Sequence, residues 1–358
     1  MSPLGGGGNT KRGMQRYVIT ILLALVGIAF FGLIVTANDY KTMPIATVGD
    51  HDKQACEPCY KIARNVYREL IVQNRMLSWH FYALVAIILL LEWTQPVYLR
   101  PRAFSVSFVF DFLWLVQNAF WVSILLPVYL DVLWRFYHFH LGFSDINMIT
   151  TWPLVAQILL AVVATDLVKW LHHILRHKVM LFWYFHAVHH SQRDLNLFTD
   201  LRVHPVDWLI EAGVSFIPFS LLRVDIALQS FVGWYLFRLW YARFYHSNIK
   251  TNLGLLRYIL VTPQSHRIHH SRRPEHQNRN YGAIFSIWDH LFGTQYRNYD
   301  EYPETGIDDA AFPHETGLGW RTMLSTLLLQ LVYPFERAFR SVTGVILPKT
   351  SGMSHSQN

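Results

Sequence analysis

The chain has 358 residues, of which 52% are hydrophobic and only 15% are charged. Soluble domains carry roughly 25% charged residues, so the composition argues against a disordered chain or a typical cytosolic enzyme and favours a multi-pass membrane protein. Nineteen histidines stand against two cysteines, which excludes a thiolate framework for zinc or iron–sulfur and leaves imidazole metal chemistry open. The net charge of +7 suits contact with anionic lipid headgroups better than nucleic acid.

The first quarter of the chain predicts one membrane anchor between polar segments. Residues 1–16 are Gly-rich and basic, and are predicted to be disordered. Residues 17–36 carry no charge, and a run of this length crosses a hydrocarbon core of about 30 Å. No small-residue cleavage site follows, so an anchor is favoured over a signal peptide. The polar loop 37–76 holds Cys56 and Cys59, for which a small disulfide is favoured over a redox role.

Five further apolar segments follow, at residues 77–93, 107–134, 152–171, 208–222 and 226–245. The second of them contains Asp111, Pro127 and Asp131, and is either one tilted span or a helical hairpin. The last two form a re-entrant or spanning hairpin. Residues 265–321 are polar and are expected to lie in water, and 323–333 are expected to form an interfacial helix.

These segments predict an all-α fold, namely a multi-pass transmembrane helical protein with a histidine-rich, membrane-proximal helical cap. We divide it into a basic start (1–16), transmembrane helices with a polar loop (17–150), a histidine-rich region with three histidine boxes (151–300), which the resemblance given below implies is catalytic, and a tail with the interfacial helix (301–358). Basic residues before the first span place the boxes on the cytoplasmic side. The membrane would be the bacterial inner membrane, or the endoplasmic reticulum in a eukaryote.

Thirteen of the 19 histidines fall between residues 172 and 290. They form three groups: His173 and His177 in HILRH, His186, His189 and His190 in HAVHH, and His266, His269 and His270 in HRIHH. On a helix, positions i, i+3 and i+4 share a face, so each group can aim its rings at a common point, and the last two groups suggest two similar half-sites. Clustered neutral imidazoles are costly unless a metal organises them. Eight ligands exceed one tetrahedral zinc, which predicts two metal ions.

The motifs around these histidines resemble those of a known family. Asp166 with the first group, then WYFHAVHHS, RVHP, TPQSHRIHHS, NYG and WDHLFGT, resembles the fatty acid hydroxylase/sterol desaturase superfamily of integral membrane di-iron oxygenases, over about residues 154–296. The resemblance implies that the eight box histidines bind two iron ions, with His246 of RFYHSN as a ninth ligand. Some members have one more histidine where this chain has Ala242, so a tenth ligand from that position is absent.

Several other residues are candidates to hold the ligating imidazoles by hydrogen bonds. They are Asp166, His204 of RVHP, Asp207 and Asp289. Asp166 stands out because it precedes His173 on the same helix face. Asp200, Asp207 and Asp289 compete for the same role, and each of these could instead be a helix cap or a surface charge. His172, His276 and His290 are expected to be structural or at the surface. No catalytic side chain is expected beyond the metal centre.

The resemblance implies an O₂-dependent oxidoreductase that uses external electrons to hydroxylate an unactivated C–H bond of a lipid, whether an acyl chain, a sterol or a related molecule. Desaturation or C-methyl oxidation on the same centre is the alternative. A separate electron donor is expected, such as a ferredoxin, cytochrome b5 or a reductase, and zinc can replace iron on overexpression. A histidine-based metal transporter and a non-redox di-metal enzyme are remoter alternatives, because the boxes flank the spans and no Asp or Glu alternates with them.

Overall fold

The structure, a computed structural model, describes residues 79–98, 105–140, 151–222, 237–238 and 240–343. The main helices are α3 (Trp79–Thr94), α4 (Val106–His140), α5 (Leu154–Lys178), α6 (Met180–His190), α7 (Pro205–Leu222), α9 (Pro263–His269), α10 (Ile287–Leu291) and α11 (Trp320–Thr343). Short 3-10 turns are η6 (Thr199–Leu201), η7 (Gly254–Tyr258) and η8 (Pro274–His276). Within these residues extended pairing is limited to isolated bridges, so the all-α prediction is confirmed for the described part of the chain.

Among the described helices, α5 alone is long and apolar enough, over Val155–Lys178, to cross a membrane by length and composition. Two shorter apolar helices cover Tyr82–Thr94 and Val106–Asn118. The segment expected at 107–134 is one continuous helix, α4, so the hairpin alternative for it is wrong. The basic start, the anchor at 17–36 and the loop with both cysteines lie outside the described residues, as does most of 226–245. The multi-pass arrangement therefore stays a prediction.

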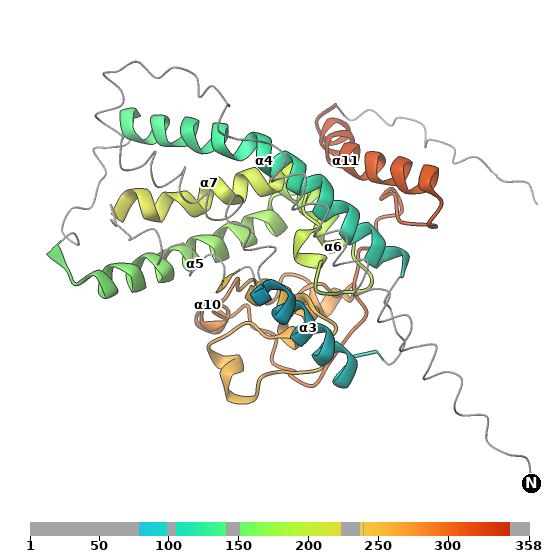
Figure 1. Cartoon of the computed structure of the whole chain (residues 1–358), viewed down its shortest axis with the longest axis horizontal. Coiled ribbons are helices and arrows are strands. Elements are labelled where there is room, and N and C mark those ends of the chain that lie inside the picture. Colours follow the sequence, from blue (N-terminus) through green and yellow to red (C-terminus); the bar gives the residue numbers. More distant parts are fainter. Residues whose placement is uncertain (1–78, 99–104, 141–150, 223–236, 239, 344–358) are drawn as a thin grey trace, which may run out of the picture.

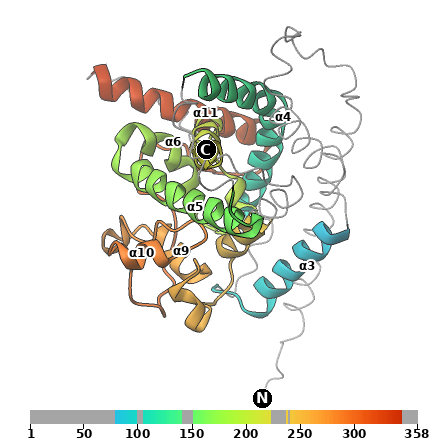
Figure 2. The same ribbon diagram turned by 90° about the vertical axis from the view of Figure 1, so that its left-hand side faces the viewer.

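Three long helices run side by side, with α7 between α4 and α5 (Figure 1). The short helix α6 packs against α5, α7 and α11. The segments that carry α9 and α10 form a cap beside the C-terminal half of α5 (Figures 1 and 2). The third histidine group thus approaches the first two from the opposite side.

Two apolar clusters fix α6 and the loop that follows it. One joins Trp114 of α4 to Ala187 and Val188 of α6. Tyr333 of α11 packs around them, together with Ile307 and Phe312 from the segment before α11. The other joins Val85, Ile88 and Leu89 of α3 to Leu197, Phe198 and Ile249. Because α6 carries the second histidine group on its polar side, burial of Ala187 and Val188 on the other side orients the imidazoles inward.

The first and second histidine groups sit on consecutive helices separated by a single residue. Val179 has extended backbone angles (φ −96°, ψ 112°) and serves both as the C-cap of α5 and as the N-cap of α6. A β-branched residue favours this conformation. The break turns α6 across the end of α5, so that rings from the two helices face each other.

The C-terminal helix α11 contains the helix expected at 323–333 and extends beyond both ends of it. It buries Thr326, Gln330 and Tyr333 against the protein and leaves other large apolar side chains, such as Leu328 and Phe339, exposed. Segregation of this kind is typical of a helix lying in a membrane interface. Its interfacial location stays a prediction.

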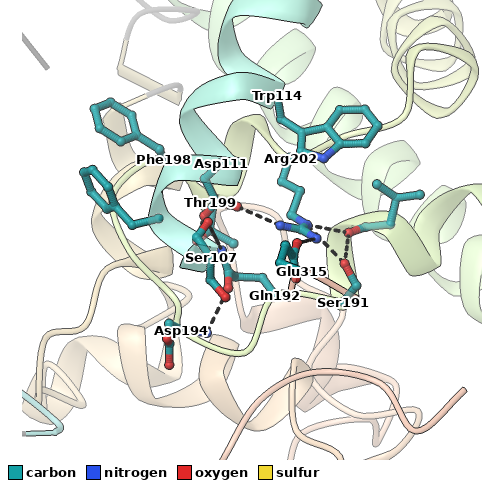
Figure 3. Close-up of polar contacts among 12 residues, drawn as sticks. Ser107, Asp111, Trp114, Ser191, Gln192, Asp194, Phe198, Thr199, Arg202 and Glu315 are labelled. Carbon is teal, nitrogen blue, oxygen red and sulfur yellow. Dashed lines mark hydrogen bonds and ion pairs between the residues drawn. The ribbon is translucent and has the colours of Figure 1, made fainter. Parts of the chain in front are cut away.

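A buried ionic cluster joins α4 to the segment after α6 (Figure 3). The guanidinium of Arg202 is completely buried and pairs with Asp111 of α4 (3.3 Å) and with Glu315. It also donates to the Val188 carbonyl (3.1 Å) and to Ser191 Oγ (3.0 Å) at the end of α6. The second Asp111 oxygen accepts from three side chains, those of Gln192, Asn196 and Thr199.

Replacing Asp111 with Ala should therefore destabilise the protein. Removal of one member of a buried ion pair costs about 3–5 kcal/mol, because the remaining charge stays desolvated. We expect a clear fall in the thermal unfolding midpoint of the protein in detergent. Ser107→Ala, one turn earlier on α4, removes a hydroxyl while keeping the main-chain carbonyl that Gln192 uses, and should have little effect. Equal stability of the two variants would contradict the role of the cluster.

Candidate metal centre

The histidine groups lie at element ends that converge in the interior. His173 and His177 occupy the last two turns of α5, and the second group occupies the last two turns of α6. In the third group, His266 and His269 lie on α9 and His270 is its C-cap; the start of α9 is fixed by a capping box between Thr262 and Ser265 and by Pro263 in its first turn. His246 ends the helical segment that follows residue 239.

The nine histidines predicted as ligands gather in two clusters, in each of which the nearest ring nitrogens lie within 4.8 Å of one another. The first cluster consists of His173, His177, His186, His190 and His269. The second consists of His189, His246, His266 and His270. Each cluster is formed by imidazoles alone, with no carboxylate among its members.

Each His-x-x-His-His group divides between the two clusters. In the second group, the i and i+4 histidines, His186 and His190, join one cluster, and the i+3 histidine, His189, joins the other. The third group does the reverse, with His269 crossing over. A helix turns by about 100° per residue, so positions i+3 and i+4 point to opposite sides of position i. The expectation that each group aims at one common point holds for His173 and His177, which share the first cluster, and is wrong for the two groups of three, each of which contributes to both clusters.

The rings meet through nitrogens that cannot all carry protons. His186 Nε2 lies 3.2 Å from Nε2 of both His173 and His190. In the second cluster the Nε2 atoms of His246 and His266 are 2.8 Å apart. Nε2 atoms of His177 and His269 are buried in the first cluster without a hydrogen-bond partner. Converging lone pairs with too few protons are what a bound cation satisfies, so the donor set fits two imidazole-ligated metal ions.

The opposite nitrogens are held by fixed acceptors. Nδ1 of four ligand candidates lies near backbone carbonyls: His173 near Tyr281 (2.8 Å), His269 near Arg279 (2.8 Å), His246 near Ala242 (2.7 Å) and His189 near Arg202 (3.3 Å). A carbonyl only accepts, so each of these Nδ1 atoms carries the proton and donates it. The tautomer that results leaves Nε2 free to bind metal.

Burial keeps these rings neutral. It lowers the pKa of His246 to about 3 and that of His269 to about 4, and the hydrogen bonds to carbonyls only partly offset this effect. The pKa values of His186, His189 and His190 lie well below the usual value for the same reason, with neighbouring histidines adding to the shift. Neutral imidazole is the form that coordinates a metal.

One of the predicted supporting acids contacts a ligand candidate directly. Asp207, at the start of α7, accepts from His186 Nδ1 at Oδ2 (3.1 Å), and its Oδ1 forms an ion pair with Arg176 Nε (2.8 Å). A carboxylate bonded to a ligating imidazole fixes its orientation and raises its basicity. The arginine keeps the carboxylate in place.

Two other predicted contacts to imidazoles are wrong. The carboxylate of Asp166 accepts from the backbone nitrogens of Ile284 (3.0 Å) and Phe285 (3.2 Å) and from Trp288 Nε1 (2.9 Å). His204 bonds through Nε2 to the Leu331 carbonyl (3.0 Å), and its ring contacts Phe185 and Phe335. Asp166 thus attaches the cap to α5, and His204 attaches α11 to α6. Sequence spacing indicates a shared face but does not say which segment packs against it.

Asp289 contacts the backbone that holds an imidazole, and not the imidazole itself. It accepts from the backbone nitrogens of Tyr281 (2.8 Å) and Gly282 (2.7 Å). This orients the Tyr281 carbonyl that receives His173. A Cβ at position 282 would lie 2.8 Å from the Phe285 carbonyl oxygen, which explains the glycine of the NYG motif. Sequence reasoning missed the four carbonyls that receive imidazoles, because every residue has a carbonyl and only the fold selects those of Arg202, Ala242, Arg279 and Tyr281.

The remaining histidines lie outside both clusters. His276 is buried, with Nδ1 2.8 Å from Ser271 Oγ and Nε2 3.4 Å from Glu301. His290 lies against the ring of Tyr258, and His172 is buried near Phe182. None of the three belongs to either cluster. Asp200 faces Arg243 at 3.8 Å.

Comparison with known proteins addresses the same region. Residues 158–294 match the family model described as fatty acid hydroxylase. Over these residues the chain is similar to the fatty acid hydroxylase family. The matched residues include all nine clustered histidines, which confirms the resemblance seen in the sequence. No solved structure matches the chain.

Curated proteins similar to this chain include an ornithine lipid hydroxylase from Rhizobium tropici, 30% identical over 53% of this chain and 53% of the relative. Alkylglycerol monooxygenases are similar too: the Homo sapiens protein is 36% identical over 35% of this chain and 27% of the relative, and the Danio rerio protein 30% identical over 60% and 46%. The chain spans about half the length of these relatives or less.

The two clusters predict a metal content of two transition-metal ions per chain after expression with ample iron. His190→Ala and His270→Ala each remove a ring from one cluster only, so each should lower the content toward one ion. Elemental analysis of detergent-purified protein measures this. His314→Ala, outside both clusters, is the control. Zinc in place of iron is consistent with the site, whereas one ion or none in the unaltered protein would contradict it.

Asp207→Asn should weaken metal binding by about 10–100-fold, the usual cost of losing a group that supports a ligand. Competition with a chelator measures the affinity. Glu211→Gln is the matched control, because Glu211 also pairs with Arg176 (2.9 Å) and is in neither metal cluster. Equal losses in the two variants would assign the effect to the ion network in general.

Proposed function

We propose that the protein is a membrane-bound di-iron oxygenase that uses O₂ and external electrons to hydroxylate a lipid. The observation that carries the proposal is the pair of all-imidazole clusters, five rings in one and four in the other. Imidazole suits iron as well as zinc, and the relatives named above are hydroxylases and monooxygenases of lipids. The reaction would insert one oxygen atom of O₂ into a C–H bond and reduce the other to water, with two electrons and two protons supplied from outside.

When bound, the two iron ions would supply the redox chemistry with O₂. The chain's own residues would hold and shield the centre. Carbonyl acceptors fix the imidazole tautomers, and Asp207 supports His186. Every member of the second cluster is buried, so bulk water would be kept away from the reacting carbon.

The alternatives fit this arrangement less well. A metal transporter must release its ion, yet these rings are fixed by hydrogen bonds to backbone and carboxylate. A non-redox di-metal enzyme needs a free base beside the metals, and the acid nearest the rings, Asp207, is already paired with Arg176. Desaturation and C-methyl oxidation start with the same hydrogen abstraction and remain alternative outcomes of the same centre.

The proposed setting is an integral membrane protein with several spans, in the bacterial inner membrane or the endoplasmic reticulum, with the clusters on the cytoplasmic side. The apolar helix α5 supports this setting. A separate donor, such as a ferredoxin, cytochrome b5 or a reductase, would deliver the electrons. The substrate would be a membrane lipid.

Mass spectrometry of lipid extracts from cells with and without the gene tests the reaction. Growth under ¹⁸O₂ should add one labelled oxygen atom to a lipid, and the product should be absent without O₂. His189 and His269 each belong to the cluster opposite to that of the other two histidines in their group. His189→Ala and His269→Ala should abolish the product, whereas His314→Ala should not. Loss of two hydrogens instead would identify a desaturase, and full activity of both box variants would contradict the proposal.

A further inference from the structure

The cap carries a cluster of exposed apolar side chains that the metal centre does not use. It consists of Leu255 (81% exposed), Leu256 and Ile259 around η7, and of Leu291 (68% exposed) and Phe292 at the end of α10. Contiguous exposed apolar surface marks a contact with protein or membrane. We call these five residues the cap patch.

The two halves of the cap patch belong to one rigid unit. Ser286 N donates to the Ile259 carbonyl (2.9 Å), and Ser286 Oγ donates to the Arg257 carbonyl (2.8 Å). Leu260 and Phe285 form an antiparallel bridge between the same segments. The turn η7 and the helix α10 therefore present their apolar side chains together.

This unit is attached to the side of α5. Asp166 accepts from the backbone of the segment just before α10, and Trp170 Nε1 donates to Asp289 (3.0 Å). The ring of Trp170 stacks on Phe292 of the cap patch at a centroid distance of 4.8 Å. Figures 1 and 2 both show α10 next to α5.

The helix face that holds the cap continues as exposed apolar surface. Leu159 and Val163 precede Asp166 and Trp170 at spacings of four, three and four residues, which lie on one helix face. Asp166 and Trp170 are buried beneath the cap, whereas Leu159 (58%) and Val163 (40%) are exposed. The rise from Val163 to Asp166 is about 4.5 Å. Any lipid that covers this face of α5 therefore reaches the edge of the cap.

Polar groups typical of a headgroup region border the cap patch. The guanidinium of Arg257 lies over the rings of Tyr258 (5.1 Å) and Tyr299 (4.3 Å). Tyrosine is enriched where hydrocarbon meets water, and a cation there favours anionic lipid. Arg257 and Tyr258 lie between Leu256 and Ile259 in the chain, so the apolar side chains of the cap patch are combined with a tyrosine and an arginine.

We propose that the cap patch inserts into the bilayer beside α5, so that the cap that contributes the third histidine group is anchored in lipid. The occupant is the membrane itself, because the patch continues the apolar face of the helix suited to span it. This revises the expectation that residues 265–321 lie entirely in water, since Leu291 and Phe292 fall within them. The inference rests on the membrane location in the proposed function, and is independent of iron and of turnover.

Site-directed spin labelling tests the insertion in nanodiscs of phosphatidylethanolamine and phosphatidylglycerol. Full-length protein with Cys56→Ser and Cys59→Ser would receive single labels through Leu255→Cys, Leu291→Cys, Gln277→Cys or Leu159→Cys. Gln277 is an exposed polar residue of the same cap and is the matched control. Labels at 255 and 291 should collide more with O₂ than with a water-soluble nickel chelate, and the label at 277 should show the reverse.

The four positions separate the possible failures. If 159 is lipid-accessible while 255 and 291 behave like 277, the insertion is wrong and the membrane span is retained. If 159 is also water-accessible, the membrane location itself fails and the inference fails with it. Dipolar broadening between labels at 255, with low access to both reagents, would show a contact between two copies and would overturn the proposal. None of these outcomes depends on hydroxylase activity.

Discussion

Nine imidazole rings converge on two points inside the protein, and each ring that binds a metal must turn an unprotonated nitrogen toward its point. The opposite nitrogen then carries a proton that needs an acceptor, because a buried donor without a partner costs free energy. Four such acceptors are backbone carbonyls, and the fifth is the carboxylate of Asp207. Much of the surrounding structure keeps these acceptors in position.

Three buried acids hold the segments that carry these acceptors. Asp289 orients the Tyr281 carbonyl, and Asp166 attaches the same segment to α5. Asp111 neutralises the guanidinium of Arg202, whose own carbonyl receives His189. Burial of these groups is costly unless each is paired. Their pairing therefore fixes α4, α5 and the cap relative to the clusters, and the acids support the metal centre without entering it.

Because His189 and His269 each join the cluster opposite to that of their helix neighbours, α6 and α9 both contribute rings to both clusters. Each metal would be held by rings from both sides of the interior, so neither α6 nor α9 could move without disturbing both sites. The clusters are nevertheless unequal, with five rings against four. Ala242, whose side chain cannot ligate, lies one turn before His246, and its carbonyl accepts from that histidine (2.7 Å).

The sequence by itself determined the helical class and eight of the clustered histidines, because both depend on local periodicity and residue chemistry, and the family resemblance added His246. It also included Asp207 among the candidate supporting residues, although it favoured Asp166. Tertiary structure decided which ring joins which cluster, since the i+3 and i+4 positions diverge around a helix and their targets lie some 80 residues away, as between His190 and His269. It also decided that carbonyls rather than Asp166 receive the imidazole protons. Carbonyls are present at every residue, so only long-range packing can select among them.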